Sequence, residues 1–497
     1  MKRYFIINSI MAIISATILV SSCEGFLDIK QDNRLSASNM WEDANDIITS
    51  TNGIYYRMRS CFVGNYINVF FWGELRVGDY MWGTSLLSNV NDNDMIAVRH
   101  STMNAMTNSC SWSSLYTAID QSNAVLKYAR KVTMTNEERT FCIGQASFAR
   151  AYCYFWAARL WGDVPLNLNP VESSTQEETY PVRTPKSQVY SQIKADIDTA
   201  VANSSALGNN KYLATSDAVN ILQAEYGLWM YRTQNGGEEM LEYAQAAISR
   251  IGISGNMLLD DYSEVFSRTN KVNREIVFAL NNDQEERHLG GYYWYFYHPS
   301  NLIASKYCQN PVPINSTQWF SYSQQFVDTL QASKAIGDKR VDCNLGYGKY
   351  GRDGEIVSWP NKFLGDMSSA QTILDCDLLY YRYAYAIILD AEAKYYGKDY
   401  QGALKSLNII AKRAYGKEHF YTDTSGEGIL NALSKEYFLE FPCEGIIWFA
   451  LIRLDKIWEY NPSLLEKKEN NPNILLWPIS QSAINKNNKL VQTEGWS

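Results

Sequence analysis

The sequence has few histidines and lacks the cysteine and serine motifs of metal centres and nucleophilic active sites. Histidine occurs only four times among 497 residues, and no two histidines have the spacing of metal ligands. Nine cysteines are present, but neither C-x-x-C nor a zinc-type spacing occurs. A G-x-S-x-G motif is also missing. We therefore expect no metal and no cofactor, and no disulfide framework, which a large domain does not need.

The chain also lacks an excess of positive charge. Lys and Arg number 45 against 53 Asp and Glu, which gives a net charge of −8. A nucleic-acid partner requires a basic surface, so we expect none. Long apolar runs are missing as well, because the stretch Phe148–Trp161 contains Arg150 and Arg159 and is too short to span a bilayer.

Aromatic residues, by contrast, are abundant. They make up 13% of the chain, with 35 Tyr and 14 Trp. This exceeds what a core commonly needs, so some of these rings are expected on the surface. Exposed Tyr and Trp offer a large, rigid contact area with a polar tip, which is typical of recognition surfaces.

The N-terminus has the features of a leader for export. Lys2 and Arg3 precede an apolar run from Ile10 to Val20, and small residues follow. Leu19-Val-Ser-Ser-Cys23 resembles a bacterial lipobox, in which the lipid-modified cysteine becomes the first residue. The alternative is an ordinary cleavage site with a chance cysteine. We predict a signal peptide over 1–22, lipidation at Cys23, and a tether over 23–35 that holds the protein at a membrane surface.

One helix organises the rest of the chain. It begins at Asn136, with Thr135 as N-cap, and ends where Gly162 and Pro165 prevent its continuation. From Phe148 to Trp161 it is apolar nearly all round, so we expect it to be buried on most sides.

An internal repeat of helix pairs follows. The segments 217–231 and 238–251 form one predicted pair, and 378–396 and 400–414 form a second. Small and matching residues recur at a shift of 167 positions, so that two antiparallel helices can nest, as in tetratricopeptide units. The matches are Leu222/Leu389, Ala224/Ala391, Glu225/Glu392, Ala244/Ala411 and Ala247/Ala414.

The remaining segments are of mixed character. Residues 275–280 read as a strand, and the C-terminal part reads as a helix, a turn and a helix over 430–441 and 445–460. Gly346–Gly351 matches G-x-G-x-x-G, but no strong strand precedes it and no helix start follows, so we interpret it as a flexible loop.

Several stretches together resemble the SusD/RagB family of cell-surface nutrient-binding lipoproteins. Arg150–Leu166 is similar to the family's signature helix and its "Y-G-D-V-P" exit. The other matching segments are Arg382–Ala393, Asn408–Ala414, the set Glu436, Glu440, Glu444, Gly445, Trp448 and Arg453, and the C-terminal Leu476–Ile479 and Gln492–Trp496. In three places the chain departs from the pattern. Tyr437, Ile447 and Ala450 stand where the family usually has Arg, Arg and Asp, which indicates that an ion-pair cluster has become apolar.

The resemblance implies an all-α, mostly helical fold with tetratricopeptide-like helix pairs and a loop-rich insertion carrying short strands. The expected single domain covers 36–497, with a helical scaffold over 36–60, 111–251 and 376–460 and a ligand region over about 62–110 and 252–375. The resemblance also implies an outer-membrane, cell-surface location through the lipid anchor. The partner it implies is a TonB-dependent, SusC-like transporter.

Candidate ligand residues are aromatic side chains with polar neighbours, because flat rings stack on the apolar faces of sugars. Asp79, Tyr80 and Trp82 form the first candidate place, and Tyr292, Trp294 and Tyr295 form the second. Trp319 is a third candidate. The predicted set is Asp79, Tyr80, Trp82, Tyr292, Trp294, Tyr295 and Trp319. The alternative for each ring is packing within the loop region.

The sequence therefore predicts a non-enzymatic glycan-binding lipoprotein that captures oligosaccharide or polysaccharide for its transporter. Peptide capture by the same architecture is the nearest alternative. A helical glycan hydrolase is another, for which Glu436, Glu440 and Glu444 would be the acids, although acids spaced by four usually form a salt-bridged or solvated helix face. A structural tetratricopeptide adaptor without ligand affinity is the last.

Overall fold

The computed structural model describes residues 40–63, 68–84, 93–173, 175–176, 179–283, 318–349, 356–363 and 375–496. Residues Asp43–Ser497 form one compact unit. The described part is mostly helical, with a few short strands, which confirms the predicted fold class. Within those ranges, no helix has both the length and the hydrophobicity to cross a membrane.

The helices and strands follow one another along the chain in a mixed order. The longer helices are α2 (Ala44–Val63), α5 (Ser113–Tyr128), α6 (Asn136–Trp161), α7 (Lys186–Ala202), α8 (Ser216–Thr233), α9 (Gly237–Ile251), α10 (Gln324–Ala335), α12 (Tyr383–Tyr396), α13 (Tyr400–Tyr415) and α14 (Gly426–Glu440). The short helices are α3 (Asn68–Gly73), the 3₁₀ turn η1 (Leu75–Tyr80), α4 (Asn93–Arg99), α11 (Val341–Asn344), α15 (Ile447–Arg453), α16 (Ile457–Tyr460), α17 (Ser463–Lys468) and α18 (Gln481–Lys486). The strands are β1 (Trp82–Thr84), β2 (Ile276–Leu280), β3 (Phe320–Tyr322), β4 (Leu345–Lys349), β5 (Ile356–Pro360) and β6 (Leu378–Arg382).

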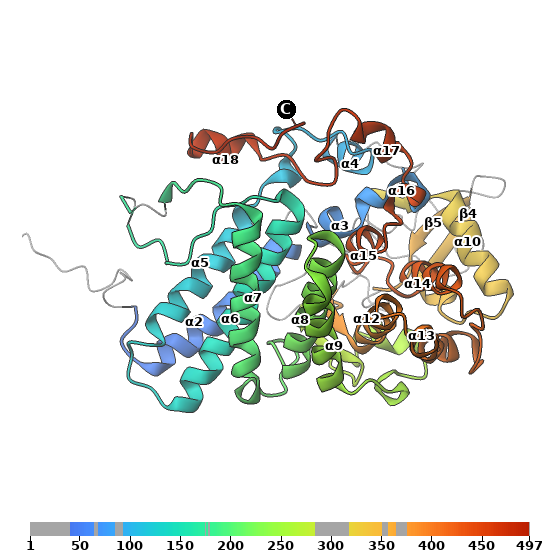
Figure 1. Cartoon of the computed structure of the whole chain (residues 1–497), viewed down its shortest axis with the longest axis horizontal. Helices are drawn as coiled ribbons and strands as arrows, with labels where there is room; N and C mark the ends of the chain where they lie inside the picture. Colours follow the sequence, from blue (N-terminus) through green and yellow to red (C-terminus); the bar gives the residue numbers. More distant parts are fainter. Residues whose placement is uncertain are drawn as a thin grey trace, which may run out of the picture. The chain divides into compact units, whose positions relative to one another are not determined.

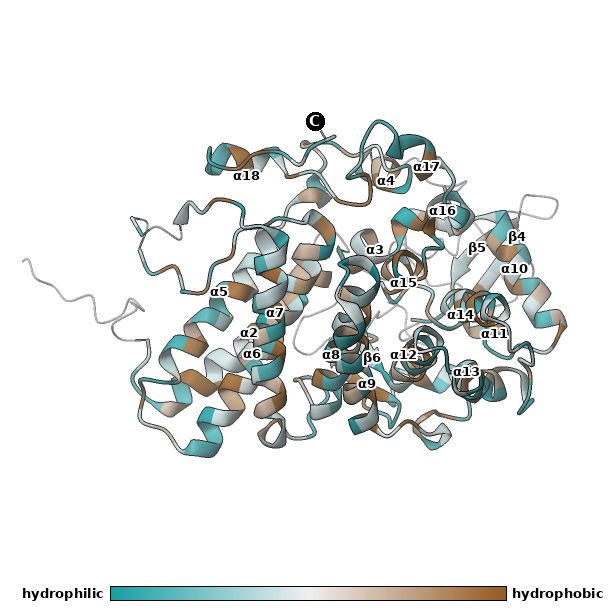
Figure 2. Cartoon of the chain, viewed as in Figure 1, coloured by the Kyte–Doolittle hydropathy of each residue, from teal (hydrophilic) through white to brown (hydrophobic). Residues whose placement is uncertain are grey.

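The long helices pack as a series of neighbours. Helix α2 packs on α5, α5 on α6, α6 on α7 and α7 on α8, and the pairs α8–α9 and α12–α13 continue the series (Figure 1). Helix α9 shows why such pairs form. Its buried residues recur at helical spacing with hydrophilic residues between them, so one face is apolar (Figure 2).

Helix α6 is the buried centre of this array, as predicted. Thr135 and Glu138 form a reciprocal capping box, in which the Glu138 N–H donates to the Thr135 hydroxyl and the Thr135 N–H donates to the Glu138 carboxylate. The helix ends at Gly162, whose φ of 71° suits glycine. Nearly all residues from Gly144 to Trp161 are buried, and Arg159 reaches Glu225 on α8 at 2.6 Å.

The predicted repeat is confirmed in its packing. All ten residues of the five matched pairs are buried. The two helices of the first pair approach closely, because a Cβ at Gly227 on α8 would lie 2.7 Å from the Met240 carbonyl oxygen at the start of α9. Small residues at these positions therefore set the distance between the helices.

Three local predictions are wrong. Residues 378–382 are not the first turns of a helix but strand β6, because they pair antiparallel with β2, the predicted strand at 275–280. The predicted helix 445–460 is interrupted between α15 and α16, where Asp455 has a φ of 56°. Gly346 and Gly348 lie in strand β4 and not in a loop, since Gly346 pairs with Trp359 of β5 and leaves room for its indole ring.

The C-terminal segment returns to the N-terminal half of the chain. Its anchor is Arg76 on η1, a fully buried cation that donates to the carbonyl oxygens of Ile474, Leu475 and Leu476. The guanidinium lies 4.5 Å from the ring centroid of Trp448 and 5.8 Å from that of Trp477. The backbone of the same segment also bonds to the end of α6, through Trp477 N–H to the Leu160 carbonyl.

Candidate ligand-binding surface

Two of the sequence-predicted ligand places are brought together by one strand pair. Strands β1 and β3 run antiparallel, with Trp82 opposite Tyr322 and Thr84 opposite Phe320. Trp319 immediately precedes β3, so it lies close to the predicted Asp79–Trp82 stretch although it is far from it in sequence. The side chain of Ser323 reinforces the junction by donating to the Tyr80 carbonyl oxygen at 2.5 Å.

Trp82 lies in the interior and not on the surface of this junction. Its side chain is 1% exposed. The ring packs edge-on against Phe70, at 4.6 Å between centroids, and in a tilted arrangement against Tyr322, at 5.2 Å. In this structure the Trp82 ring therefore packs within the loop region, and neither of its faces is accessible to a ligand.

Tyr80 and Asp79 lie nearer the surface. Tyr80 is half-buried, with its ring 4.8 Å from that of Tyr460 and 4.9 Å from that of Phe438. The Asp79 side chain is 73% exposed and lies 3.3 Å from Arg99 Nε. Burial, with help from Arg99, lowers the pKa of His100, so the contact between Asp79 and His100 is not an ion pair at neutral pH. Asp79 is thus an accessible polar group beside a partly accessible ring.

Trp319 is partly exposed and is the more open of the two predicted tryptophans that the structure describes. Its neighbour Gln318 is buried and fixes the backbone there by donating to the Ser358 carbonyl oxygen at 2.7 Å. The remaining predicted place, which comprises Tyr292, Trp294 and Tyr295, lies outside the described residues.

Glu436, Glu440 and Glu444 are not free carboxylates. All three are buried, and Glu444 lies in the turn after α14 and not on its face, because the helix ends at Glu440. They belong to a buried ion network of five carboxylates and four cations. Its members are Glu275, Asp338, Glu436, Glu440, Glu444, Arg340, Lys362, Arg382 and Arg413. Such pairing confirms the salt-bridged interpretation and leaves no poised acid and base for hydrolysis.

This network should make the protein sensitive to acid. Burial raises the pKa of Glu440, but Arg413, Arg382 and Arg340 more than offset it, so the carboxyl titrates well below its usual range. The pKa of Asp338 is lowered in the same way, where burial opposes Arg340. A carboxyl whose pKa is lower in the folded state stabilises the fold above its unfolded pKa and loses that stabilisation as the pH falls.

We therefore expect the free energy of unfolding to fall below about pH 4.5, by roughly 1.4 kcal/mol per pH unit for each extra proton that the unfolded chain binds. Urea denaturation at a series of pH values between neutral and acidic would measure this slope. A flat profile down to about pH 3 would show that folding does not lower the pKa values of these carboxyls.

The predicted loss of an ion-pair cluster is only partly correct. Ile447 and Ala450 are buried apolar residues. Tyr437, however, keeps a polar role: its hydroxyl donates to Glu392 at 2.8 Å and accepts from Arg453 at 3.0 Å. The phenol takes part in the buried Arg453–Glu392 pair, so the site remains polar.

One polar feature of the surface was not foreseen from the sequence. Serines, asparagines and a threonine line a pocket between the ends of α2, α3, α5 and α18. A Ser-rich run at Ser109–Ser114 was the only local sign of it. In the part of the chain that the structure describes, no group of three or more His, Cys, Asp or Glu residues could hold a metal ion.

The chain is similar to known proteins in both sequence and fold. A family model described as starch-binding associating with outer membrane matches residues 25–221, and a model of the SusD family matches residues 347–496. SusD-like protein P38 of Formosa agariphila is 21% identical, over 99% of both chains. The structure of B. fragilis NanU is 26% identical, with a TM-score of 0.77 over 93% of this chain and 98% of that one. A laminarin-binding SusD-like protein is 19% identical, with a TM-score of 0.74 over 92% and 100%.

These matches and the helical-pair architecture define a class of binding proteins, not enzymes, that are associated with the outer membrane. The chain belongs to the SusD/RagB family.

Proposed function

We propose that the protein captures a glycan at the cell surface, with the β1–β3 junction around Trp319 as part of its binding surface. The observation that carries this proposal is the convergence of Trp319, Tyr80 and Asp79 on one junction from distant parts of the sequence. A partly open indole can stack on the C–H face of a sugar, and a carboxylate nearby can accept bonds from its hydroxyls. The starch-binding description of the matched family and the laminarin-binding relative support a glycan as ligand.

We further propose that the protein is anchored through a lipid at Cys23 and passes its ligand to a TonB-dependent, SusC-like transporter. The lipobox-like segment at 19–23 supports the anchor. The match to the SusD family supports the partner. Co-purification of the transporter with the lipidated protein is the direct test.

Replacement of Trp319 by alanine should weaken glycan binding by about tenfold or more without lowering the thermal stability. Truncation of a tryptophan that contacts ligand typically costs about 2 kcal/mol, and 1.4 kcal/mol is tenfold in Kd. The measurement is an array of polysaccharides, oligosaccharides and peptides, followed by calorimetric titration of the best ligand. Trp496→Ala removes another partly exposed tryptophan, held by the Asn473 carbonyl at 3.3 Å, and should bind as the unaltered protein does.

Peptide capture by the same architecture is the second candidate. Binding confined to peptides on the array would establish it in place of glycan capture. Absence of binding to every member of the array would contradict both, and would leave an interaction with the transporter as the role of the protein.

A further inference from the structure

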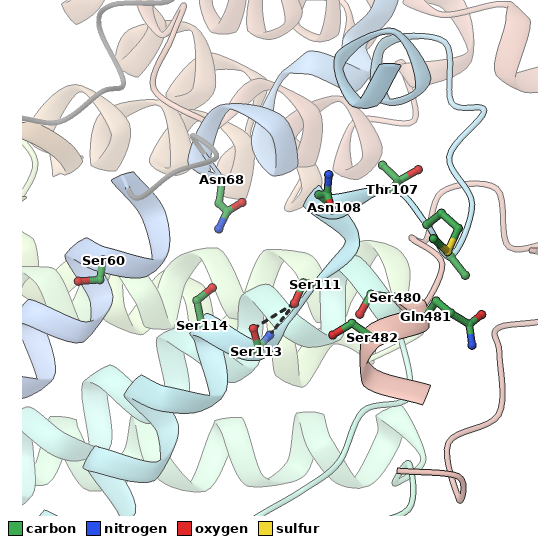
Figure 3. Close-up of a pocket in the computed structure, with 12 residues that line it drawn as sticks. Ser60, Asn68, Thr107, Asn108, Ser111, Ser113, Ser114, Ser480, Gln481 and Ser482 are labelled. Carbon is green, nitrogen blue, oxygen red and sulfur yellow. Dashed lines mark hydrogen bonds between the residues drawn. The ribbon is translucent and has the colours of Figure 1, made fainter. Parts of the chain in front are cut away.

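A pocket with a volume of about 500 Å³ shares no lining residue with the β1–β3 junction. It is formed where the end of α2, the start of α3, the segment before α5 and the start of α18 meet (Figure 3). Side chains from these four parts of the chain surround one space, with Asn68 on one side and Ser111, Ser113 and Ser114 on the other (Figure 3). We call it the serine pocket.

The serine pocket is polar but uncharged. Twelve described residues line it, and ten of them carry a hydroxyl or a carboxamide; the other two are Ala105 and Met106. Hydroxyl and carboxamide groups both donate and accept hydrogen bonds. A ligand with many neutral hydroxyls matches such a lining, whereas a charged group would lose its hydration without gaining a counter-charge.

The walls of the pocket are fixed by hydrogen bonds, while some of its polar groups remain available. Gln481 N–H donates to the Ala105 carbonyl at 2.7 Å and so ties α18 to the segment before α5. By contrast, the side chains of Ser60, Asn108 and Ser482 make no hydrogen bond to another described residue, and all three are exposed. These three groups can exchange water for ligand hydroxyls at little cost.

Met106 adds an apolar contact at the same place. Its side chain is 74% exposed, which is unusual for a large apolar residue, and it lines the serine pocket. A thioether adapts its shape to the surface that it meets, and a pyranose ring presents C–H groups on one face. Met106 is therefore suited to cover a sugar whose hydroxyls bond to the serines.

A second hollow extends the serine pocket. It has a volume of about 300 Å³ and shares Ser111, Ser113 and Ser482 with the serine pocket. The rings of Trp112 and Tyr116 are among its lining. A ligand longer than a single sugar unit can therefore continue from the hydroxyl-lined part toward aromatic side chains.

We propose that the serine pocket is a second ligand site, which takes a neutral hexose or N-acetylhexosamine unit and discriminates against uronic acids. This inference rests on the proposed glycan capture and adds to it a site that Trp319 does not line. A protein with two such sites would hold one glycan chain at two points, with one end in the serine pocket and the remainder at the β1–β3 junction.

The test is saturation-transfer NMR on the purified protein with glucose, galactose, mannose, N-acetylglucosamine and glucuronic acid. At least one neutral sugar should show saturation transfer, and glucuronic acid should show none. Ser482→Trp, which places an indole from an exposed position into the pocket, should reduce the signal at least tenfold. Met106→Ser should weaken it without blocking the space. Trp319→Ala and Ser187→Trp, an exposed control on α7 outside both hollows, should leave it unchanged.

Each contrary result has its own meaning. A neutral-sugar signal that survives both Ser482→Trp and Met106→Ser, or an equal signal from glucuronic acid, would overturn the second site. The second site is also overturned if no monosaccharide binds while the array finds a glycan whose binding is lost in Trp319→Ala. The proposed function then stands. If the protein binds no glycan on the array, that result would instead contradict the proposed function. If Ser482→Trp does not fold, Met106→Ser decides alone.

Discussion

Replacement of Arg382 by methionine is expected to lower the free energy of unfolding by about 3–5 kcal/mol, the typical cost of breaking a buried ion pair. The guanidinium is buried and bonds to three carboxylates: Nη1 to Glu440 at 2.6 Å, Nε to Glu444 at 2.7 Å and Nη1 to Glu275 at 3.0 Å. Methionine fills part of the volume but leaves these carboxylates with fewer cations in the interior. The loss of stability comes from the buried carboxylates that no longer face a cation, and not from the loss of the arginine atoms themselves.

Denaturation in urea would measure this loss, with Lys412→Met as the matched control. Lys412 also pairs with a carboxylate, Glu418, at 2.7 Å, but both side chains are more than half exposed. Water and salt screen such a pair, so the control should lose at most about 1 kcal/mol. An equally small loss in Arg382→Met would mean that water reaches the network and that it is not the dry core described above.

Replacement of Trp82 by alanine is expected to destabilise the protein by about 3–5 kcal/mol, as in other large-to-small changes of a buried aromatic residue. The indole is held between Phe70 and the β3 residues Phe320 and Tyr322, so its removal leaves a cavity beneath the strand pair. Any loss of glycan binding in this variant should follow the unfolded fraction and should recover at lower temperature, where the protein is folded.

Trp319→Ala provides the contrast, because the two tryptophans come from the same junction. It should leave the denaturation midpoint nearly unchanged while it weakens binding. A Trp82→Ala variant that is as stable as the unaltered protein, yet has lost its ligand, would show that the Trp82 ring is on the surface in solution. Chemical denaturation and titration on the same samples separate the two cases.

The difference between these two tryptophans explains what could be predicted from the sequence. Helix pairs are visible locally, since Ala224 and Ala391 recur at matching places and the residues near them show helical spacing. The burial of Trp82 depends on strand β3, some 240 positions further along the chain, and no local pattern reports that pairing. Strand β6 cannot be told from a helix by local pattern for the same reason, because its partner β2 lies about a hundred residues away.

Contacts between polar residues from distant segments also could not be predicted from local patterns. The spacing of Glu436 and Glu440 correctly predicted a shared helix face, but the cations that neutralise them come from α11's flank, β6 and α13. The serine pocket draws on residues from 60 to 482, which come from four separate parts of the chain. Features assembled from distant segments require the fold before they can be recognised.

The position of Arg76 has a consequence for the timing of folding. Its acceptor at Ile474 is synthesised 398 residues later. At about 5–20 residues per second, a ribosome needs roughly 20 to 80 s to cover that distance. Until that segment is made, the Arg76 guanidinium lacks its carbonyl acceptors at Ile474, Leu475 and Leu476. A chain that stops before this segment is therefore expected to be less stable and to be cleaved by proteases more readily than the full-length chain.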